Sequence, residues 1–186
     1  MPRAAKDRRI ERTRQAVLGA FVQLMLEGRR YDRIKVSDLI DRAGVGRSTF
    51  YEHYRNKDEV LSESIRHPFA MLADAVERGF DVARLRSVLV HFVENRVQVR
   101  AVFAGNARRQ VSRVLASMIE ERMRSRAKKN GVATSASIKI AAVAIADGQL
   151  AAIVSWLGDG VARDEIQLAE TLCRIAQATA REICGN

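Results

Sequence analysis

Apolar residues recur along the chain at the three- and four-residue spacing that places them on one face of a helix. The clearest case runs from Asp7 to Glu27, where one apolar stripe consists of Ile10, Val17, Leu18, Phe21, Val22 and Met25. The same spacing predicts further helices at about 36–43, 47–54, 56–78, 84–95, 97–104, 107–129, 134–157 and 164–184. No strand-like alternation of any length interrupts this pattern, so we predict an all-α protein.

Glycine and asparagine mark the breaks between the predicted helices. Gly28 ends the first helix, and Gly44-Val45-Gly46 forms a tight turn between the second and the third. Asn56 is a suitable N-cap for the fourth helix, in which Pro68 predicts a bend. The remaining breaks fall at 79–81, 105–106, 130–131 and 158–160.

Basic residues are concentrated in two segments of a chain whose net charge is +10. Residues 1–60 hold 14 Lys or Arg against 9 Asp or Glu, and residues 108–129 hold 8 against 2. Such an excess favours a polyanionic partner, either nucleic acid or an anionic membrane surface. The 108–129 helix has no interleaved aromatic residues. We interpret it as a solvated face, with an anionic effector site or a second protein surface as the alternatives.

Neither of the most apolar stretches has the features of a targeting or membrane segment. The run at 16–26 follows a basic N-terminus that contains Asp7 and Glu11, and a charged segment stands where a secretory peptide would be cleaved. The run at 138–157 is interrupted by two charged residues and a glutamine, which argues against a membrane span. We therefore expect a cytoplasmic protein.

The two cysteines, Cys173 and Cys184, fall on one predicted helix. Eleven residues of helix separate them by roughly 16 Å. The Cα atoms of a disulfide lie within about 7 Å of each other. We therefore expect two free thiols buried as small apolar side chains.

The stretch "GVGRSTFY" at 44–51 allows two interpretations, a nucleotide-binding phosphate loop or the turn and recognition helix of a DNA-binding module. A phosphate loop requires a glycine where Asp41 stands, a lysine where Arg47 stands and a preceding buried strand. None of these is present. The helix-turn-helix interpretation instead explains two short helices joined by a glycine turn. On the third helix, Phe50 and Tyr54 share one face, which leaves Arg47 and Tyr51 for the other.

The segment "VSDLIDRAGVGRSTFYEHYRNKDEVL" at 36–61 resembles the TetR family of bacterial transcriptional regulators. The resemblance extends from about Arg9 to Leu61 and implies a three-helix, helix-turn-helix DNA-binding domain at 1–57. The helices of 58–186 would then form a bundle that binds an effector and dimerises. Two positions depart from the family's pattern, because Lys35 and Gly46 stand where the family usually has hydroxyl residues that cap helices.

The resemblance also implies which residues contact DNA. Five of these lie on or beside the third helix, and the others begin the second and fourth helices, where they would bind phosphates. The expected contacts are Lys35, Ser37, Arg47, Ser48, Thr49, Tyr51, His53 and Lys57. Arg47 is the candidate for reading bases, because arginine binds guanine in a bidentate manner.

The helix predicted at 134–157 is apolar nearly all round, so we expect a second copy of the chain to cover one of its faces. The small and apolar residues expected in this dimer interface are Ala144, Gly148, Ala151, Ala152, Leu172, Ile175, Ala176 and Thr179. A dimer would bind a roughly palindromic operator. An effector pocket among the middle helices would use Phe69, Met71, His91, Phe92, Asn95, Phe103, Met118, Asp147 and Trp156.

The sequence thus predicts a dimeric, ligand-responsive DNA-binding repressor with no cofactor and no metal. One alternative is a helical enzyme. It lacks a nucleophile paired with a base, because no Cys or Ser stands beside one of the three histidines in a turn. A helical protein-interaction module without DNA function is the other alternative, and a DNA-binding assay separates it from the repressor.

Overall fold

The computed structural model describes residues 2–104, 107–133, 135–158 and 164–185. These residues form nine α-helices and one short 3₁₀ helix, with no strand among them, which confirms the all-α prediction. In chain order the elements are α1 (Pro2–Leu26), η1 (Tyr31–Arg33), α2 (Val36–Ala43), α3 (Arg47–His53), α4 (Lys57–Asp74), α5 (Val82–Glu94), α6 (Arg96–Ala104), α7 (Arg108–Lys129), α8 (Ala136–Trp156) and α9 (Glu165–Cys184).

Helix bounds differ from the predicted ones mainly at α1 and α4. The first helix begins at Pro2, five residues earlier than predicted, because its first residues carry no apolar stripe in the sequence. The fourth ends at Asp74 and continues through Pro68, which lies inside the helix. Asn56 caps α4 as predicted, since its Oδ1 accepts the backbone N–H of Glu59 at 3.0 Å. The break predicted at 105–106 lies outside the described residues. Of the break predicted at 158–160, only residue 158 is described.

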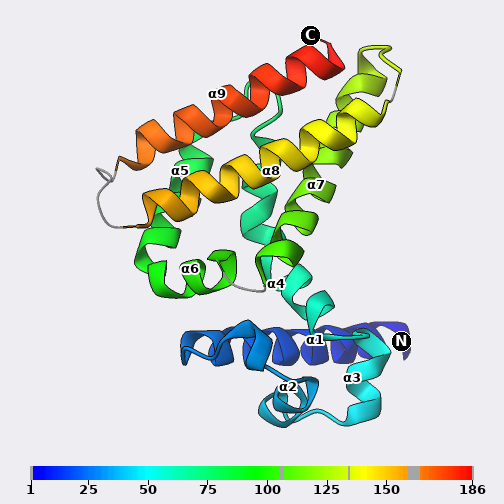
Figure 1. The fold of residues 1–186 in the computed structure, drawn as a ribbon. Helices are drawn as coiled ribbons and strands as arrows, with labels where there is room; N and C mark the ends of the chain where they lie inside the picture. The colour runs from blue at the N-terminus through cyan, green and yellow to red at the C-terminus, as the bar shows by residue number, and fades with distance from the viewer. Residues whose placement is uncertain (1, 105–106, 134, 159–163, 186) are drawn as a thin grey trace.

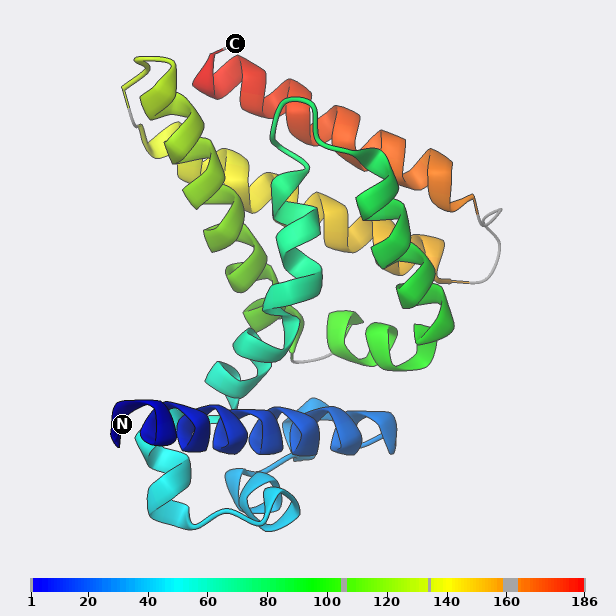
Figure 2. The ribbon, with the colours of Figure 1, turned by 180° about the vertical axis from the view of Figure 1, so that it is seen from behind.

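The helices are arranged in two groups (Figure 1). Helices α1, α2 and α3 form a layer at one end, and α4 leads from this layer into a bundle of α5 to α9. In the bundle α8 and α9 lie side by side, and α4 and α7 pack behind them, as the reverse view in Figure 2 shows. The structure therefore has an N-terminal helix-turn-helix group, followed by a C-terminal helical bundle.

One continuous core connects the two groups. Phe50 of α3 and Leu61 of α4 are fully buried in it at one end, and Leu72 and Ile153 at the other. Gln149 is a buried polar side chain, 3% exposed, and its Nε2 donates to the carbonyl of Leu72 at 3.1 Å. This bond joins α8 to the last turn of α4, the helix that carries the first group.

Two arginines of the basic helix α7 join elements together, so this helix is not simply a solvated face. Arg122 forms an ion pair with Asp74 of α4 at 3.0 Å. Arg126 donates to the carbonyls of Val76, at 3.1 Å, and Gly185, at 3.0 and 3.1 Å. The charge pattern could not reveal these bonds, because the partners lie about 50 residues or more away in the chain.

Candidate nucleic-acid interface

The turn between α2 and α3 is formed by Gly44, Val45 and Gly46. Gly44 ends α2 with φ 64° and ψ 33°, a left-handed conformation that glycine adopts without steric penalty. Its N–H donates to the carbonyl of Asp41 at 3.3 Å, and the N–H of Val45 donates to the carbonyl of Ile40 at 3.2 Å. These bonds are typical of a helix that ends on glycine. The predicted turn is confirmed, and it sets the direction of α3.

Helix α3 has a buried face and an exposed face. Phe50 is fully buried and Tyr54 is 3% exposed, with their ring centroids 5.7 Å apart. Arg47, Ser48 and Tyr51 are exposed, and Tyr51 retains 47% of its surface. Thr49 and His53 are half-buried between the two faces. The helix thus packs through its aromatic residues and presents a cation and hydroxyl groups to solvent.

Arg47 and Tyr51 form a pair on the exposed face. The guanidinium carbon lies 5.8 Å from the centroid of the Tyr51 ring, in a cation–π contact. The Tyr51 ring in turn packs edge-on against Phe50, with centroids 5.4 Å apart and planes at 88°. The buried Phe50 therefore supports Tyr51, and Tyr51 supports Arg47. Arginine and tyrosine held in this way can donate hydrogen bonds to phosphates or to base edges.

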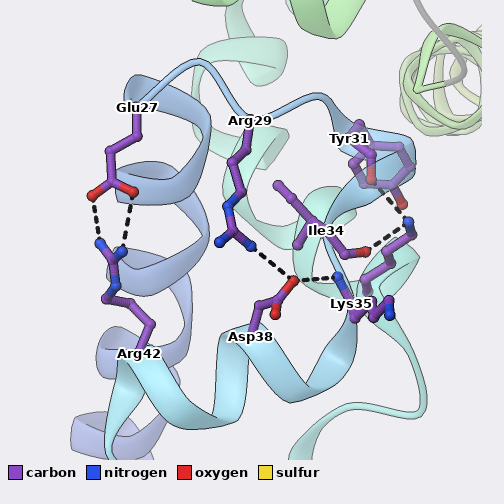
Figure 3. A network of polar contacts seen from close by, with 8 residues as sticks. Glu27, Arg29, Tyr31, Ile34, Lys35, Asp38 and Arg42 are labelled. Carbon is purple, nitrogen blue, oxygen red and sulfur yellow. Dashed lines mark hydrogen bonds and ion pairs between the residues drawn. The ribbon is translucent and has the colours of Figure 1, made fainter.

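Ion pairs hold α2 against the end of α1 (Figure 3). Arg42 of α2 makes two bonds to the carboxylate of Glu27, at 2.6 and 3.0 Å. Its hydrogen bonds to Glu27 hold the pKa of that carboxyl below its usual range. Arg29 lies 3.0 Å from Asp38 Oδ2 in the first turn of α2. Sequence reasoning assigned no role to these four residues, although Glu27 and Arg42 carry opposite charges at the facing ends of consecutive helices.

Lys35 and Ser37 are exposed at the start of α2. The backbone N–H of Lys35 donates to Asp38 Oδ2 at 2.9 Å, which caps the helix from inside its first turn. The Lys35 side chain has no acceptor atom and cannot cap the helix. This agrees with the expectation from the sequence, since Lys35 replaces a capping hydroxyl residue of the family pattern. Its ammonium can therefore point into solvent, and the Ser37 hydroxyl follows two residues later.

Lys57 is directed toward the protein interior. Its Nζ donates to the carbonyls of Tyr31, at 2.8 Å, and Ile34, at 2.9 Å, and lies 4.5 Å from the centroid of the Tyr31 ring. The Tyr31 hydroxyl donates to the carboxylate of Asp58, and burial followed by this carboxylate raises the pKa of Tyr31. An ammonium has three protons, so one remains for a phosphate. Sequence reasoning missed this network because the 3₁₀ helix η1 was not predicted.

Five of the predicted effector residues line one cavity of about 190 Å³, here called the α1–α6 cavity. They are Phe69, His91, Phe92, Asn95 and Phe103. The rings of Phe69 and Phe92 lie edge-on to Phe103, with centroids 5.7 and 5.5 Å away. Sequence reasoning missed that α1 forms one wall of this cavity.

The other four predicted effector residues lie outside the α1–α6 cavity. Asp147 is exposed on α8 and accepts a hydrogen bond from the Ser112 hydroxyl at 2.8 Å. Trp156 lines a different cavity, between α8 and α9. Met71 and Met118 are half-buried on α4 and α7. Helical spacing alone could not separate these positions from the cavity wall, because all four stand among apolar neighbours.

The exposed face of α8 and α9 retains most of the predicted dimer residues. Ala144, Gly148, Ala151 and Ile175 are exposed, and Ala152 and Thr179 are half-buried. Larger apolar side chains accompany them, because Ile140 is 70%, Val143 43% and Ile166 51% exposed. Leu172 and Ala176 correct the prediction, since they are 4% and 0% exposed within this chain. They lie on the opposite face of α9, which packs into the chain's own core.

Among the described residues, α8 is the one helix long and apolar enough to cross a membrane by length and composition. Its most apolar window has a mean hydropathy of 1.6, and 44% of that window is buried inside the protein. A core helix of a bundle has the same properties, so this finding is weak evidence for a span.

Comparison with known proteins relates the two parts of this architecture to regulators. Residues 25–63, which include α2 and α3, match the family described as bacterial regulatory proteins, tetR family. The uncharacterized HTH-type transcriptional regulator YxbF of Bacillus subtilis (strain 168) is 40% identical over 68 residues, or 37% of this chain and 18% of that protein. The chain spans from 18% to 32% of the length of three curated relatives that it matches.

Solved structures resemble the whole fold. A TetR transcriptional regulator from Streptococcus agalactiae 2603V is 25% identical, with a TM-score of 0.58 over 93% of this chain and 98% of that one. The structure of RolR with its ligand resorcinol shares the fold at 23% identity, with a TM-score of 0.50 over 97% and 96% of the two chains. The proteins of this family are regulators rather than enzymes. The helix-turn-helix segment therefore resembles the TetR family of bacterial regulatory proteins, and the whole fold resembles that of a TetR transcriptional regulator.

Proposed function

We propose that this protein is a dimeric transcriptional regulator that binds a palindromic DNA operator and represses transcription until a small effector releases it. The exposed pair of Arg47 and Tyr51 on α3 carries the proposal. The buried Phe50 supports this pair, and Gly44 fixes the turn that precedes α3. Both features suit a helix that enters the major groove. Because it binds DNA, the protein would act in the bacterial cytoplasm.

Each DNA contact has a chemical role in this proposal. Arg47 reads guanine through two of its guanidinium N–H groups. Ser48, Thr49 and Tyr51 donate hydroxyl protons to phosphates or base edges, and His53 adds a ring N–H at the end of α3. At the helix starts, Lys35 and Ser37 bind phosphate. Lys57 contributes its one remaining proton and, chiefly, holds the start of α4 against η1.

A second copy of the chain is the proposed partner of α8 and α9. Ile140, Val143 and Ile175 expose between 43% and 70% of their surface beside the small residues Ala144 and Gly148. An apolar patch of this kind marks a protein interface more often than a free surface. Two copies related by a twofold axis would place two α3 helices on two half-sites, which explains the expected palindrome.

The experiment is selection of bound duplexes from a random DNA library by the full-length protein. Enrichment of an inverted repeat, bound with an affinity that falls steeply as salt rises, is the expected result. Recovery of unenriched sequences after repeated rounds would contradict the proposal and favour an interaction module without DNA function. A single half-site without a repeat would contradict the dimer and leave DNA recognition by α3 supported.

A further inference from the structure

The α1–α6 cavity lies between the helix-turn-helix group and the bundle. Phe21, Val22, Met25 and Leu26 of α1 form one wall, and α4, α5 and α6 form the others. In Figure 2, α6 lies directly above the C-terminal half of α1, with α4 beside both. A molecule in this cavity would therefore contact the helix that supports α2 and α3 and, at the same time, the bundle.

Helix α1 contacts different elements along its length. Near its middle, Arg14 bonds to Glu63 of α4 through Nε at 3.0 Å and Nη2 at 2.5 Å. In its last two turns, Val22 and the final residue Leu26 line the cavity while 45% and 50% of their surfaces remain exposed. This end also carries Glu27, whose carboxylate holds Arg42 of α2. Glu27 therefore connects the end of α1 that lines the cavity to α2.

The lining restricts the charge and size of a ligand. Among the described residues that line the cavity none is Lys, Arg, Asp or Glu, and the one histidine, His91, is exposed. An ionic ligand would therefore lose its hydration without gaining a permanently charged counter-ion. The volume of about 190 Å³ is somewhat larger than an apolar cavity of about 150 Å³ that holds one benzene ring. Phe69, Phe92 and Phe103 provide ring edges and faces for an aromatic ligand. A neutral molecule with one substituted ring fits these walls.

The α4 wall adds a hydrogen-bond acceptor. Pro68 has no N–H, so the carbonyl of Ser64, one turn earlier, lacks its usual helical donor. Both residues line the cavity. The Ser64 hydroxyl proton is already donated to the carbonyl of Leu61 at 2.8 Å, which leaves its oxygen free to accept. A ligand with an O–H or N–H group would satisfy these acceptors.

We propose that the α1–α6 cavity binds a neutral, single-ring aromatic molecule with a hydrogen-bond donor, and that its occupancy sets the position of the C-terminal half of α1. This regulatory role rests on the proposed DNA-binding function. The ligand joins α1 to α6 across the cavity, so the α2–α3 group is held in a different orientation from that of the unliganded protein. Effector control then acts directly on the DNA-binding group, through its own first helix.

The first test uses p-cresol and the DNA-free protein. Calorimetry is expected to show one p-cresol per chain with a dissociation constant on the order of 0.1–1 mM. The anionic isostere 4-methylbenzoate should bind about tenfold more weakly or not at all. In hydrogen exchange, p-cresol should slow the amides of residues 19–26 about threefold or more and leave residues 8–15 unchanged. Absence of p-cresol binding, or binding without protection of 19–26, would overturn the proposal.

Substitutions in the cavity wall, compared with a control outside it, test whether p-cresol binds in the α1–α6 cavity. Val22→Trp fills the cavity from α1 and should weaken p-cresol binding about tenfold. Leu26→Glu introduces a carboxylate at a half-exposed wall position, where it is tolerated by the fold, and should weaken binding similarly. Val97→Trp is the control, because Val97 is 67% exposed on α6 and does not line the cavity. Equal binding by Val97→Trp and by both cavity variants would contradict the assigned site.

A DNA-binding measurement with and without p-cresol distinguishes failure of this proposal from failure of the proposed function. With a duplex enriched by selection, saturating p-cresol should change the dissociation constant for DNA about fivefold or more. DNA binding that p-cresol leaves unchanged would overturn the regulatory role. If the wild-type protein binds no DNA while p-cresol still protects residues 19–26, the proposed function fails and the ligand site stands.

Discussion

Arg14 of α1 donates from Nε, at 3.0 Å, and from Nη2, at 2.5 Å, to one carboxylate oxygen of Glu63 on α4. These bonds raise the pKa of Arg14. Tyr54 lies beside the pair, and burial, followed by the Glu63 charge, raises its pKa to about 12. The pair therefore connects the first helix of the DNA-binding group with the helix that enters the bundle, next to the buried aromatic residues of α3.

Replacing Glu63 with glutamine should weaken this connection. The substitution removes the carboxylate charge and keeps the size of the side chain. Because Arg14 is 42% exposed, we expect the free energy of unfolding to fall by only about 1 kcal/mol. Urea denaturation measures the change, and Glu94→Gln, at an exposed position on α5, is the control. Equal stability of Glu63→Gln and wild type would show that the pair does not stabilise the fold.

Lys57→Met should destabilise the protein more than loss of a surface lysine. The methionine keeps the aliphatic stem but leaves the carbonyls of Tyr31 and Ile34 without the ammonium donor. We expect a loss of about 1–2 kcal/mol in the free energy of unfolding. Lys128→Met, at an exposed position on α7, should change it little. If both variants unfolded at the same urea concentration, the internal bonds of Lys57 would contribute nothing measurable.

The two cysteines should resist thiol reagents until the protein unfolds. Burial raises the pKa of Cys173 to about 11 and also raises the pKa of Cys184. At about pH 8 the thiolate fraction of Cys173 is then roughly a hundredfold below that of an exposed cysteine. Labelling with a chromogenic disulfide should be slower by at least about this factor than in guanidinium chloride.

The raised pKa of Cys173 also predicts how the free energy of unfolding changes with pH. Because its pKa is raised in the folded state from about 9 to about 11, its contribution to stability is complete below about pH 9 and is lost as the pH rises through about 11. Rapid labelling of the native protein at about pH 8 would contradict the burial of both thiols.

Ile175→Arg should abolish the proposed dimer without unfolding the chain. Ile175 is 58% exposed on α9, so an arginine is tolerated in a single chain but would be buried between two copies. Light scattering should give twice the 20.8 kDa chain mass for wild type and the single mass for the variant. Val97→Arg, at a position 67% exposed on α6, should remain dimeric. A dimeric Ile175→Arg would remove α9 from the interface.

Local features of this structure could be predicted from the sequence, whereas most contacts between residues distant in the chain could not. The two glycines at 44 and 46, and the spacing of Phe50 and Tyr54, predicted the turn and the buried face of α3 because local conformation determines both. The sequence could not show that Leu172 and Ala176 face the core of their own chain, because the last helix is apolar on two faces. The bonds from Lys57 to Tyr31 and Ile34 span more than twenty residues, and they depend on a 3₁₀ helix without a sequence signature.

The most direct test of the central claim is a fluorescence anisotropy titration of the selected duplex with wild type, Arg47→Ala and Arg86→Ala. Arg86 is exposed on α5, away from the helix-turn-helix group, so its variant controls for the loss of one positive charge. If α3 reads the operator, Arg47→Ala should weaken binding by about 1–3 kcal/mol, roughly 5- to 150-fold. Arg86→Ala should bind as wild type does. Equal affinities for all three proteins would contradict recognition of DNA by α3.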